Sequence, residues 1–228
     1  MQSSPKPRIY PTVLPGSAPV RPAGETPETV LTLSEVQRFL AGKDENARLA
    51  ALAEGDPLDL AERSKRWLTR SCLLFDVQPF VERASVAISR DHALFGQLAG
   101  VHSLPLECWL DRGFRRTANT LHARDQELDA ARRPLPDPLS PRFLFLQAVL
   151  GIERTALRSA CITANALPED ERRAFHFLLV QGRSLDEYAH LGGVGRAGVK
   201  RAFRSAMKTI GGAHECAARG EDFPMEQA

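Results

Sequence analysis

An all-α protein made of two small helical domains is the fold class that the sequence predicts, on three observations. Apolar residues recur at helical spacing along most of the chain, whereas the alternation typical of strands is scarce. The 228 residues are 43% hydrophobic, which suits two ordinary domains of about 80 residues. A proline-rich stretch separates two helical parts. We therefore predict domains over 31–128 and 142–213, joined by a semi-rigid linker over 129–141.

The two ends of the chain are predicted to be tails. Residues 1–30 are rich in proline and small polar residues, with too few apolar side chains to offset the entropy of ordering. We expect a disordered tail there and a second tail over 214–228. Docking of Ile9-Tyr10 or Val13-Leu14 onto a partner is the alternative for the first tail.

The first domain is predicted to be a helical bundle. Ordered structure is expected to begin near Thr32, and a helix from Ala47 to Glu54 is expected to end at Gly55-Asp56-Pro57. Long amphipathic stretches follow over 59–75, 79–97 and 106–130.

The last of these stretches carries a basic face. Trp109, Leu110 and Phe114 are expected to pack inward with Leu121. The residues left for solvent or for DNA are Arg112, Arg115, Arg116, Asn119, His122 and Arg124. A solvated basic face and contact with DNA phosphates are both open, and a loop such as 100–105 offers room for an unstacked base.

The second domain opens with an apolar helix from Phe143 and then shows a series of helix signals. Leu167-Pro168-Glu169 is a good helix start, since proline at the first turn loses no hydrogen bond and acidic residues complement the helix dipole. Gly182 is predicted to close that helix in a left-handed conformation. Ser184 and Glu187 form the pattern of a capping box, so a second helix is expected to start at Ser184.

A tight turn and a basic helix follow. Ala189 is expected where two helices cross closely, Gly193 supplies the turn, and Val199 returns to the same core. The basic residues of the last helix are Arg196, Lys200, Arg201, Arg204 and Lys208. This order is typical of a helix-turn-helix that places side chains in a DNA groove. Arg196 and Lys200, near the helix start, are predicted to read bases, and the other three to hold phosphates, unless the face is merely solvated.

Residues 167–210 resemble the promoter-binding domain of bacterial sigma factors, in particular the two-domain extracytoplasmic-function class. The matching motifs are Leu167-Pro168-Glu169-x-Glu171-Arg172, Gly182-x-Ser184-x-x-Glu187, Ala189-x-x-x-Gly193 and Val199-Lys200. Where the family usually has Ser or Thr at the start of the recognition helix and Thr before Val-Lys, this chain has Gly195 and Gly198. Other departures are Gly192 before the turn and Ala202 in place of an arginine.

The first domain is similar to the sigma domain that binds polymerase and melts the promoter. The landmarks are Ala53-Glu54-Gly55-Asp56 and Trp109-Leu110. This resemblance implies that core RNA polymerase, promoter DNA and an anti-sigma factor are candidate partners. It also implies downstream promoter contacts for the basic face of 106–130. For the clamp-binding motif the nearest equivalent is Ser89-x-x-His92-x-x-Phe95.

Other function classes find little support in the sequence. The histidines are scattered, and the chain contains no HExxH, Gly-x-Ser-x-Gly or phosphate-loop motif. We therefore expect no enzymatic activity, no cofactor, no metal and no small-molecule substrate. The four cysteines are far apart, and no signal or membrane segment is evident, which favours reduced thiols and a cytoplasmic location without a membrane partner.

Net charge alone does not indicate a nucleic-acid partner, because it is only +2, but local basic patches can bind phosphates. The leading hypothesis is a sigma-like initiation factor that binds core polymerase and directs it to promoters. Two alternatives remain: a helix-turn-helix regulator without polymerase binding, and a degenerate sigma-like scaffold for protein interactions.

Overall fold

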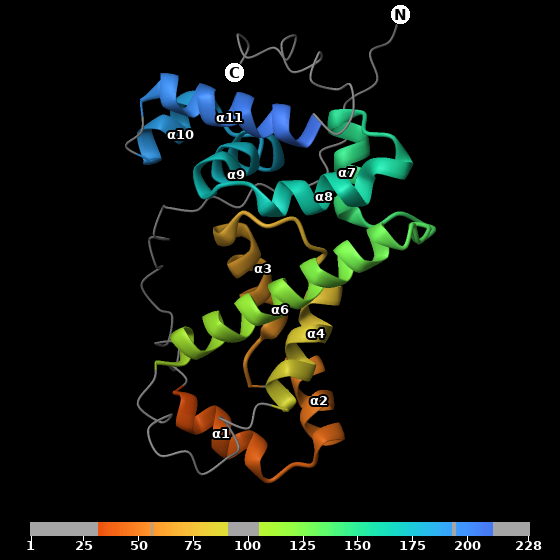
Figure 1. The fold of residues 1–228 in the computed structure, drawn as a ribbon. Helices are drawn as coiled ribbons and strands as arrows, with labels where there is room; N and C mark the ends of the chain where they lie inside the picture. The colour runs from red at the N-terminus through yellow and green to blue at the C-terminus, as the bar shows by residue number, and fades with distance from the viewer. Residues whose placement is uncertain (1–31, 56, 91–104, 193–194, 212–228) are drawn as a thin grey trace, which may run out of the picture. The chain divides into compact units, whose positions relative to one another are not determined.

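Helices form every regular element in the described part of the chain, which is residues 32–55, 57–90, 105–192 and 195–211 of the computed structural model (Figure 1). The all-helical prediction is confirmed. The chain divides into two compact units, one within 28–134 and the other containing 135–211. The predicted tails at 1–30 and 214–228 lie outside the described residues.

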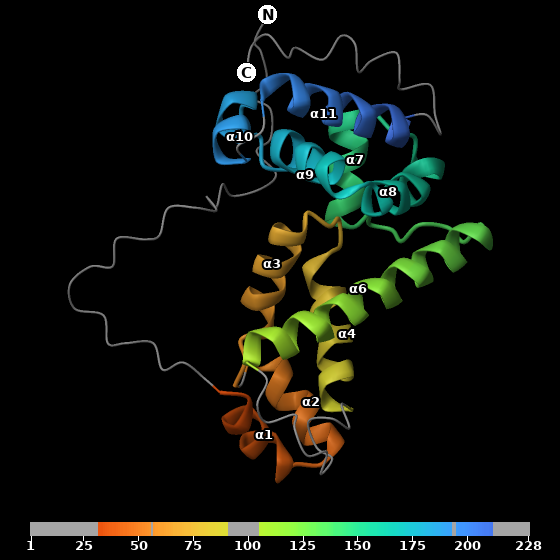
Figure 2. The same ribbon diagram turned by 60° about the vertical axis from the view of Figure 1, so that its left-hand side comes forward.

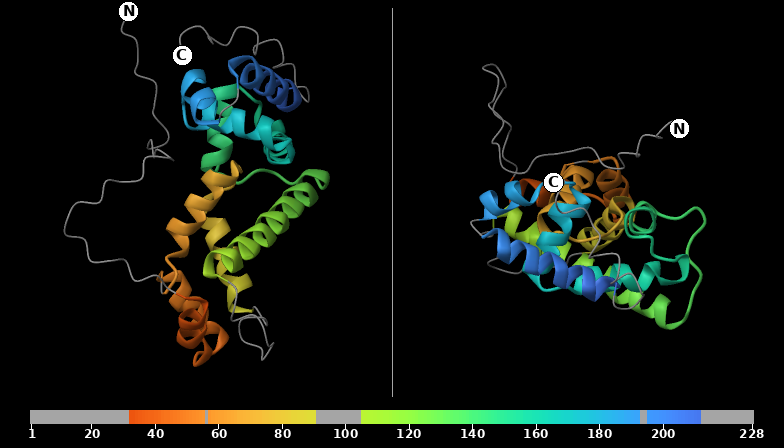
Figure 3. Two further views of the ribbon diagram at one scale, coloured as in Figure 1. Left: turned by 90° about the vertical axis from the view of Figure 1, so that its left-hand side faces the viewer. Right: turned by 90° about the horizontal axis from the view of Figure 1, so that it is seen from above.

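The first unit is a bundle in which α6 packs on α4 and α3 and lies across both (Figures 1 and 3). Its helices are α1 (Leu33–Ala41), α2 (Glu45–Ala53), α3 (Leu60–Ser71), α4 (Val77–Ser89) and α6 (Leu106–Ala130). These bounds confirm the predicted helices over 47–54 and 106–130 closely. The helix predicted from Pro79 begins two residues earlier, because proline is tolerated in the first turn, where its missing N–H has no partner to lose.

The start of α1, directly after Thr32, is fixed by reciprocal hydrogen bonds. The Thr32 N–H donates to Glu35 Oε2 over 2.7 Å, and the Glu35 N–H donates to Thr32 Oγ1 over 3.3 Å. The bond from the Thr32 backbone is the main reason that the pKa of Glu35 lies below its usual value. Both bonds satisfy backbone donors that a helix start leaves unpaired.

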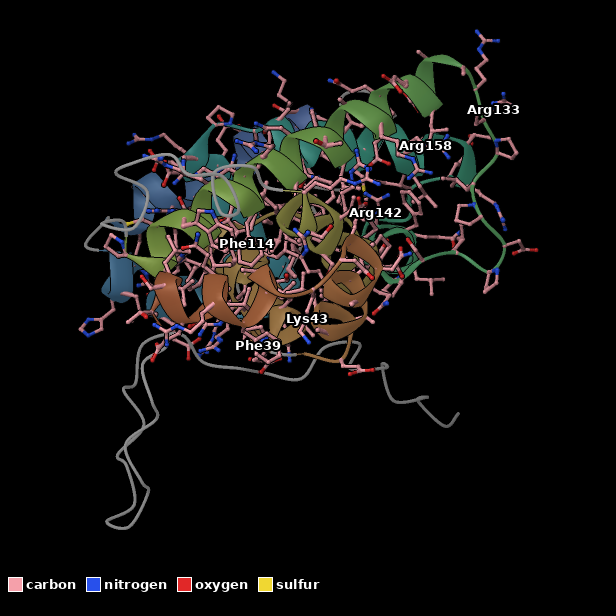
Figure 4. All side chains as sticks on the ribbon, turned by 90° about the horizontal axis from the view of Figure 1, so that it is seen from below. Phe39, Lys43, Phe114, Arg133, Arg142 and Arg158 are labelled. Carbon is pink, nitrogen blue, oxygen red and sulfur yellow. The ribbon has the colours of Figure 1, made fainter. Side chains whose placement is uncertain are left out.

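Three aromatic rings from three helices form the centre of this unit. Trp67 of α3, Phe80 of α4 and Phe114 of α6 have ring centroids 5.7 to 5.8 Å apart, a separation at which aromatic pairs attract beyond simple burial. Phe114 is labelled in Figure 4. Trp109 is only 6% exposed and belongs to the same core, as predicted.

Helices α3 and α6 both end on a residue with positive φ that is not glycine. Cys72 follows α3 with φ of 56°, and Arg132 lies just beyond α6 with φ of 49°. The next N–H in each case closes the helix, from Leu73 to the Leu68 carbonyl over 3.1 Å and from Arg133 to the Leu128 carbonyl over 2.9 Å. This is the bond pattern of the Schellman motif, in which the left-handed position usually holds glycine.

The second unit contains five α-helices and two short helical segments, among its described residues. They are α7 (Pro141–Leu150), η2 (Arg154–Ala156), α8 (Leu157–Ala166), α9 (Glu169–Phe175), η3 (His176–Val180), α10 (Leu185–Gly192) and α11 (Arg196–Gly211). Helix α11 packs along α9 and also contacts α10 and α8 (Figure 2). Residues 131–140 form the non-helical connection before α7.

The helix signals predicted over 167–187 are confirmed. Helix α9 begins directly after Pro168, and Gly182 has φ of 62°. The Ser184 N–H donates to Glu187 Oε2 over 2.9 Å, and the Glu187 N–H donates to Ser184 Oγ over 3.2 Å. The bond from the Ser184 backbone is the main cause of the lowered pKa of Glu187.

The π-helical turn η3 between α9 and Gly182 was not predicted. Its first residue, His176, is 5% exposed, and its carbonyl accepts a hydrogen bond from the N–H of Gln181, five residues on, over 2.9 Å. Its Nδ1 lies 3.2 Å from Nε2 of Gln181. Burial lowers the pKa of His176 to about 4, so the ring is neutral at pH 7.

Candidate nucleic-acid interface

Helix α11 has one buried face and one basic face. Val199, Phe203 and Ile210 are at most 3% exposed, and Ala206 is buried between them. Arg201, Arg204 and Lys208 are exposed and recur at i, i+3 and i+7, which places them together on the opposite side. The sequence of Arg196–Gly211 contains no acidic residue. The charged residues on the outward face of α11 are therefore all positive.

The packing of α10 against α11 determines the direction in which the basic face of α11 points. Val199 and Phe203 share a core cluster with Leu185 of α10, and Ala189 packs against it. The predicted return of Val199 to the core that Ala189 contacts is confirmed. Ala174 of α9 belongs to the same core, so α9 forms its third side.

The two glycines at the start of α11 differ in their position relative to the helix. Gly195 precedes the helix, and its carbonyl accepts hydrogen bonds from the N–H groups of Gly198 and Val199 over 2.8 and 3.2 Å. Only Gly198 therefore carries the roughly 0.5–1 kcal/mol disadvantage of glycine inside a helix.

Arg196, predicted to read bases, is held by a carboxylate of the preceding helix. Its Nη2 donates to Asp186 Oδ2 over 2.7 Å, and both side chains are exposed. This ion pair joins α10 to the first residue of α11. Lys200, the other predicted reader, is partly buried and has no carboxylate within 4.0 Å in the described part of the chain.

The predicted basic face of α6 is present, with one member engaged. The exposed members are Arg112, Arg115, Arg116, Asn119 and Arg124, and His122 is partly buried. Arg115 Nε donates to Asp111 Oδ2 over 2.7 Å, and Asp111 Oδ1 accepts from Trp67 Nε1 over 2.8 Å. The bond from Trp67 is the largest cause of the lowered pKa of Asp111. Arg115 is thus tied to the core through Asp111.

Two arginines beside this face were missed by sequence reasoning. Arg83 of α4 lines an open groove of about 820 Å³ together with Arg116 and Arg124 of α6. Arg70 of α3 lies 3.8 Å from Asp111 on the other flank of α6. No local pattern marks either residue, because their positions depend on how α3 and α4 pack against α6.

Ser89 is the one predicted polymerase-binding residue within the described part of the chain. Ser89 is 2% exposed, and its hydroxyl donates to the Val86 carbonyl over 2.9 Å. Its own carbonyl accepts from Arg48 Nη1 over 3.0 Å. Ser89 therefore offers no hydroxyl to a partner at the surface, and its role in polymerase binding stays a prediction. His92 and Phe95 lie outside the described residues.

Within the described ranges, no three His, Cys, Asp or Glu side chains gather closely enough to hold a metal ion. None of the helices described is both long and apolar enough to cross a membrane. Comparison with family models, with curated proteins and with solved structures found no match for the chain.

Proposed function

We propose that this chain is a sigma-like transcription initiation factor that binds core RNA polymerase and directs it to specific promoters. In this proposal α10 and α11 are the helix-turn-helix that reads an upstream promoter element. The unit within 28–134 engages polymerase and uses α6 on the downstream element. Residues 131–140 link the two.

The basic face of α11 is the observation that carries the proposal. Arg201 and Lys208 are seven residues apart, so their Cα atoms are separated by about 10 Å along the helix axis at 1.5 Å per residue. That length fits a DNA major groove about 12 Å wide. The absence of acidic residues in α11 removes internal competition for Arg201, Arg204 and Lys208. These three cations are available for phosphates.

The face of α6 supports a second DNA contact. Arg112, Arg116 and Arg124 are exposed, and no carboxylate of the described residues lies within 4.0 Å of them. By contrast, the exposed Arg115 and Arg90 pair with Asp111 and Glu45. Three unpaired guanidinium groups on one helix favour a phosphate-bearing partner.

A second candidate is a helix-turn-helix regulator that does not bind polymerase. The burial of Ser89 favours it, because this residue belongs to the stretch nearest to a clamp-binding motif. Both candidates require DNA binding through α11, and only polymerase binding distinguishes them.

Run-off transcription with purified core polymerase and genomic promoter fragments tests the first candidate. We expect transcripts from a subset of fragments and recovery of polymerase subunits in a native pull-down. Sequence-specific DNA binding without transcription or polymerase recovery supports the second candidate. If transcription, polymerase recovery and sequence-specific DNA binding are all absent, both candidate functions are wrong.

A double substitution, R201Q/R204Q, tests the basic face of α11. We expect promoter-duplex affinity, measured by fluorescence anisotropy, to fall at least tenfold at 100 mM salt, because the variant cannot neutralise two of the DNA phosphates. The dependence of log K on log salt should become shallower by roughly 0.9 for each phosphate that is no longer neutralised.

The matched control is R154Q/R173Q. It removes the same charge from the same unit, but Arg154 pairs with Asp137 and Arg173 with Glu169. Equal losses of affinity in both double variants would mean that net charge, and not the face of α11, determines binding.

A further inference from the structure

Three cations on the outward face of α11 have no anionic partner among the described residues. Arg201, Arg204 and Lys208 are exposed, and no carboxylate of the described ranges lies within 4.0 Å of them. Glu171 of α9 accepts a hydrogen bond from the Ser205 hydroxyl over 2.9 Å, but it forms no ion pair with these cations. The face is therefore open to an anionic segment.

The stretch of chain that follows α11 has the opposite charge. Residues 212–228, which we call the acidic tail, come directly after Gly211 and lie outside the described residues. The tail contains one arginine and four acidic residues, which are Glu215, Glu221, Asp222 and Glu226. Helix α11 itself contains no acidic residue. The sequence thus places an excess of negative charge beside a helix whose charged residues are all positive, and such charges attract.

The acidic tail is long enough to return along α11. At 1.5 Å per residue, Arg201 lies about 15 Å from the end of the helix at Gly211, measured along its axis. A chain extended at about 3.3 Å per residue covers about 33 Å between Gly211 and Glu221. That length exceeds the return path even with about 10 Å added for crossing the helix diameter. Glu221 and Asp222 can therefore reach Arg201 and Arg204.

Tethering makes the acidic tail a better occupant of this face than a second copy of the chain. One exposed ion pair changes an equilibrium by only about 1.4- to fivefold, so two or three such pairs bind separate molecules weakly. A segment joined to its site by a short stretch of chain has an effective concentration in the millimolar range. The same few ion pairs then suffice to hold the tail on α11 in a large share of the molecules at low salt.

We propose that the acidic tail docks on the basic face of α11, with Glu221 and Asp222 opposite Arg201 and Arg204, and competes with DNA for that face. The competition rests on the proposed function, whereas the contact between tail and helix does not. Docking lowers the observed DNA affinity in proportion to the fraction of molecules in which the face is free. A cationic partner that takes up the tail would therefore raise that affinity.

Paramagnetic relaxation in the full chain tests the contact without DNA. A nitroxide is attached at M225C in a C108S/C216S background, because Cys72 and Cys161 are buried. We expect the amide signals of residues 201–208 to broaden at 50 mM salt and to recover at 500 mM, where screening is stronger. Adding R201Q/R204Q should remove the broadening at 50 mM.

A mixed sample identifies which molecule the tail occupies. Nitroxide-labelled chain without ¹⁵N is combined with unlabelled chain that carries ¹⁵N, so that only contacts between molecules broaden the signals. We expect no broadening over 201–208 in this sample. Broadening there would assign the tail to a second copy and overturn docking within one chain.

The affinity for a promoter duplex tests the competition. We expect E221Q/D222N to bind the duplex about three- to fivefold more tightly at 50 mM salt, measured by fluorescence anisotropy. The matched control is E153Q/D170N, which removes the same charge from two exposed residues of the same unit that form no ion pair in the described ranges. We expect the control to change the affinity less than 1.5-fold.

Two results overturn the proposal. Unbroadened signals over 201–208 at 50 mM salt exclude the contact, and equal gains of affinity in both double variants exclude the competition, because net charge would then explain them. The proposed function is judged separately by run-off transcription and duplex binding. A chain with the salt-sensitive broadening but without transcription or duplex binding retains the tail contact and loses the initiation role.

Discussion

His176 shows how burial of one side chain makes the second unit sensitive to acid. Its pKa is about 4 in the folded chain, and an unfolded histidine titrates near 6.5. Between pH 4 and pH 6.5 the His176 ring is therefore protonated more often in the unfolded state than in the folded state. The folded state is therefore favoured above pH 6.5, and this contribution is lost as pH falls from 6.5 toward 4.

We expect the free energy of unfolding of the second unit to fall by on the order of 1 kcal/mol between pH 7 and pH 5.5. Urea titrations followed by helical circular dichroism measure it. Tryptophan emission is an internal control, because Trp67 and Trp109 both lie in the first unit. The transition seen by tryptophan should not carry this pH dependence.

His176→Gln should remove the pH dependence over this range, because it removes the titrating ring. His190→Gln is the control, since His190 is exposed on α10. An equal flattening of the pH dependence in both variants would exclude burial of His176 as the cause.

Single residues were predictable where their role is local. Ser184 and Glu187 form a capping pair because they are three residues apart, and Trp109 lies in the core because of its helical register. The Arg196–Asp186 pair joins residues on two helices, so it depends on the angle at which α10 meets α11. The position of Arg83 in a groove depends likewise on packing between helices.

Helix ends divide into those that glycine marks and those that it does not. Gly151 after α7 and Gly182 after η3 have positive φ, and a glycine at such a position is a visible stop signal. Cys72 and Arg132 adopt the same backbone conformation without that signal. The end of α6 was nevertheless predicted, because the proline-rich stretch after Arg133 cannot continue a helix.

Arg132→Gly should stabilise the first unit by up to about 1 kcal/mol. The left-handed conformation disfavours residues with a Cβ by roughly 1–2 kcal/mol, and the greater freedom of glycine in the unfolded chain offsets part of that gain. Urea unfolding followed by tryptophan emission measures the change.

Ala131→Gly is the matched control for this substitution. Ala131 has φ of −79°, so glycine there relieves no strain and only adds freedom to the unfolded chain. We expect a small loss of stability. Stabilisation by both substitutions would show that the conformation of Arg132 is not the reason.

At the scale of the molecule, helical periodicity was enough to predict the fold class, and the prolines after residue 133 were enough to locate the division near Pro134. The basic faces of α6 and α11 were also predictable, because helix geometry converts spacing into direction. The groove between α4 and α6 was not, since it exists only once two helices pack. The π-helical turn at His176 likewise has no established signal in the local sequence.

The net charge of +2 conceals a strong separation of charge along the chain. The charged residues of α11 are all basic, whereas the starts of α9 and α10 carry Glu169, Asp170, Glu171, Asp186 and Glu187. Only Asp186 among these acidic residues pairs with a cation of α11. Of the two residues predicted to read bases, Arg196 alone is thus paired with a carboxylate of the described residues.

Asp186→Asn should strengthen promoter-duplex binding by about 1.4- to fivefold at low salt, a gain that corresponds to an exposed ion pair of roughly 0.2–1 kcal/mol. Fluorescence anisotropy with the same duplex measures it. Asp170→Asn removes the same charge from the same unit without freeing Arg196, so a gain of equal size there would point to net charge.

Under the proposed function, the pair between Arg196 and Asp186 would make DNA binding a two-step equilibrium. In one population the arginine is held by the carboxylate, and in the other it is free to turn toward a base. The observed affinity equals the intrinsic affinity multiplied by the fraction of molecules in the free population. If the proposal holds, the strength of this ion pair, and not only the residues that contact DNA, would set the promoter affinity of the chain.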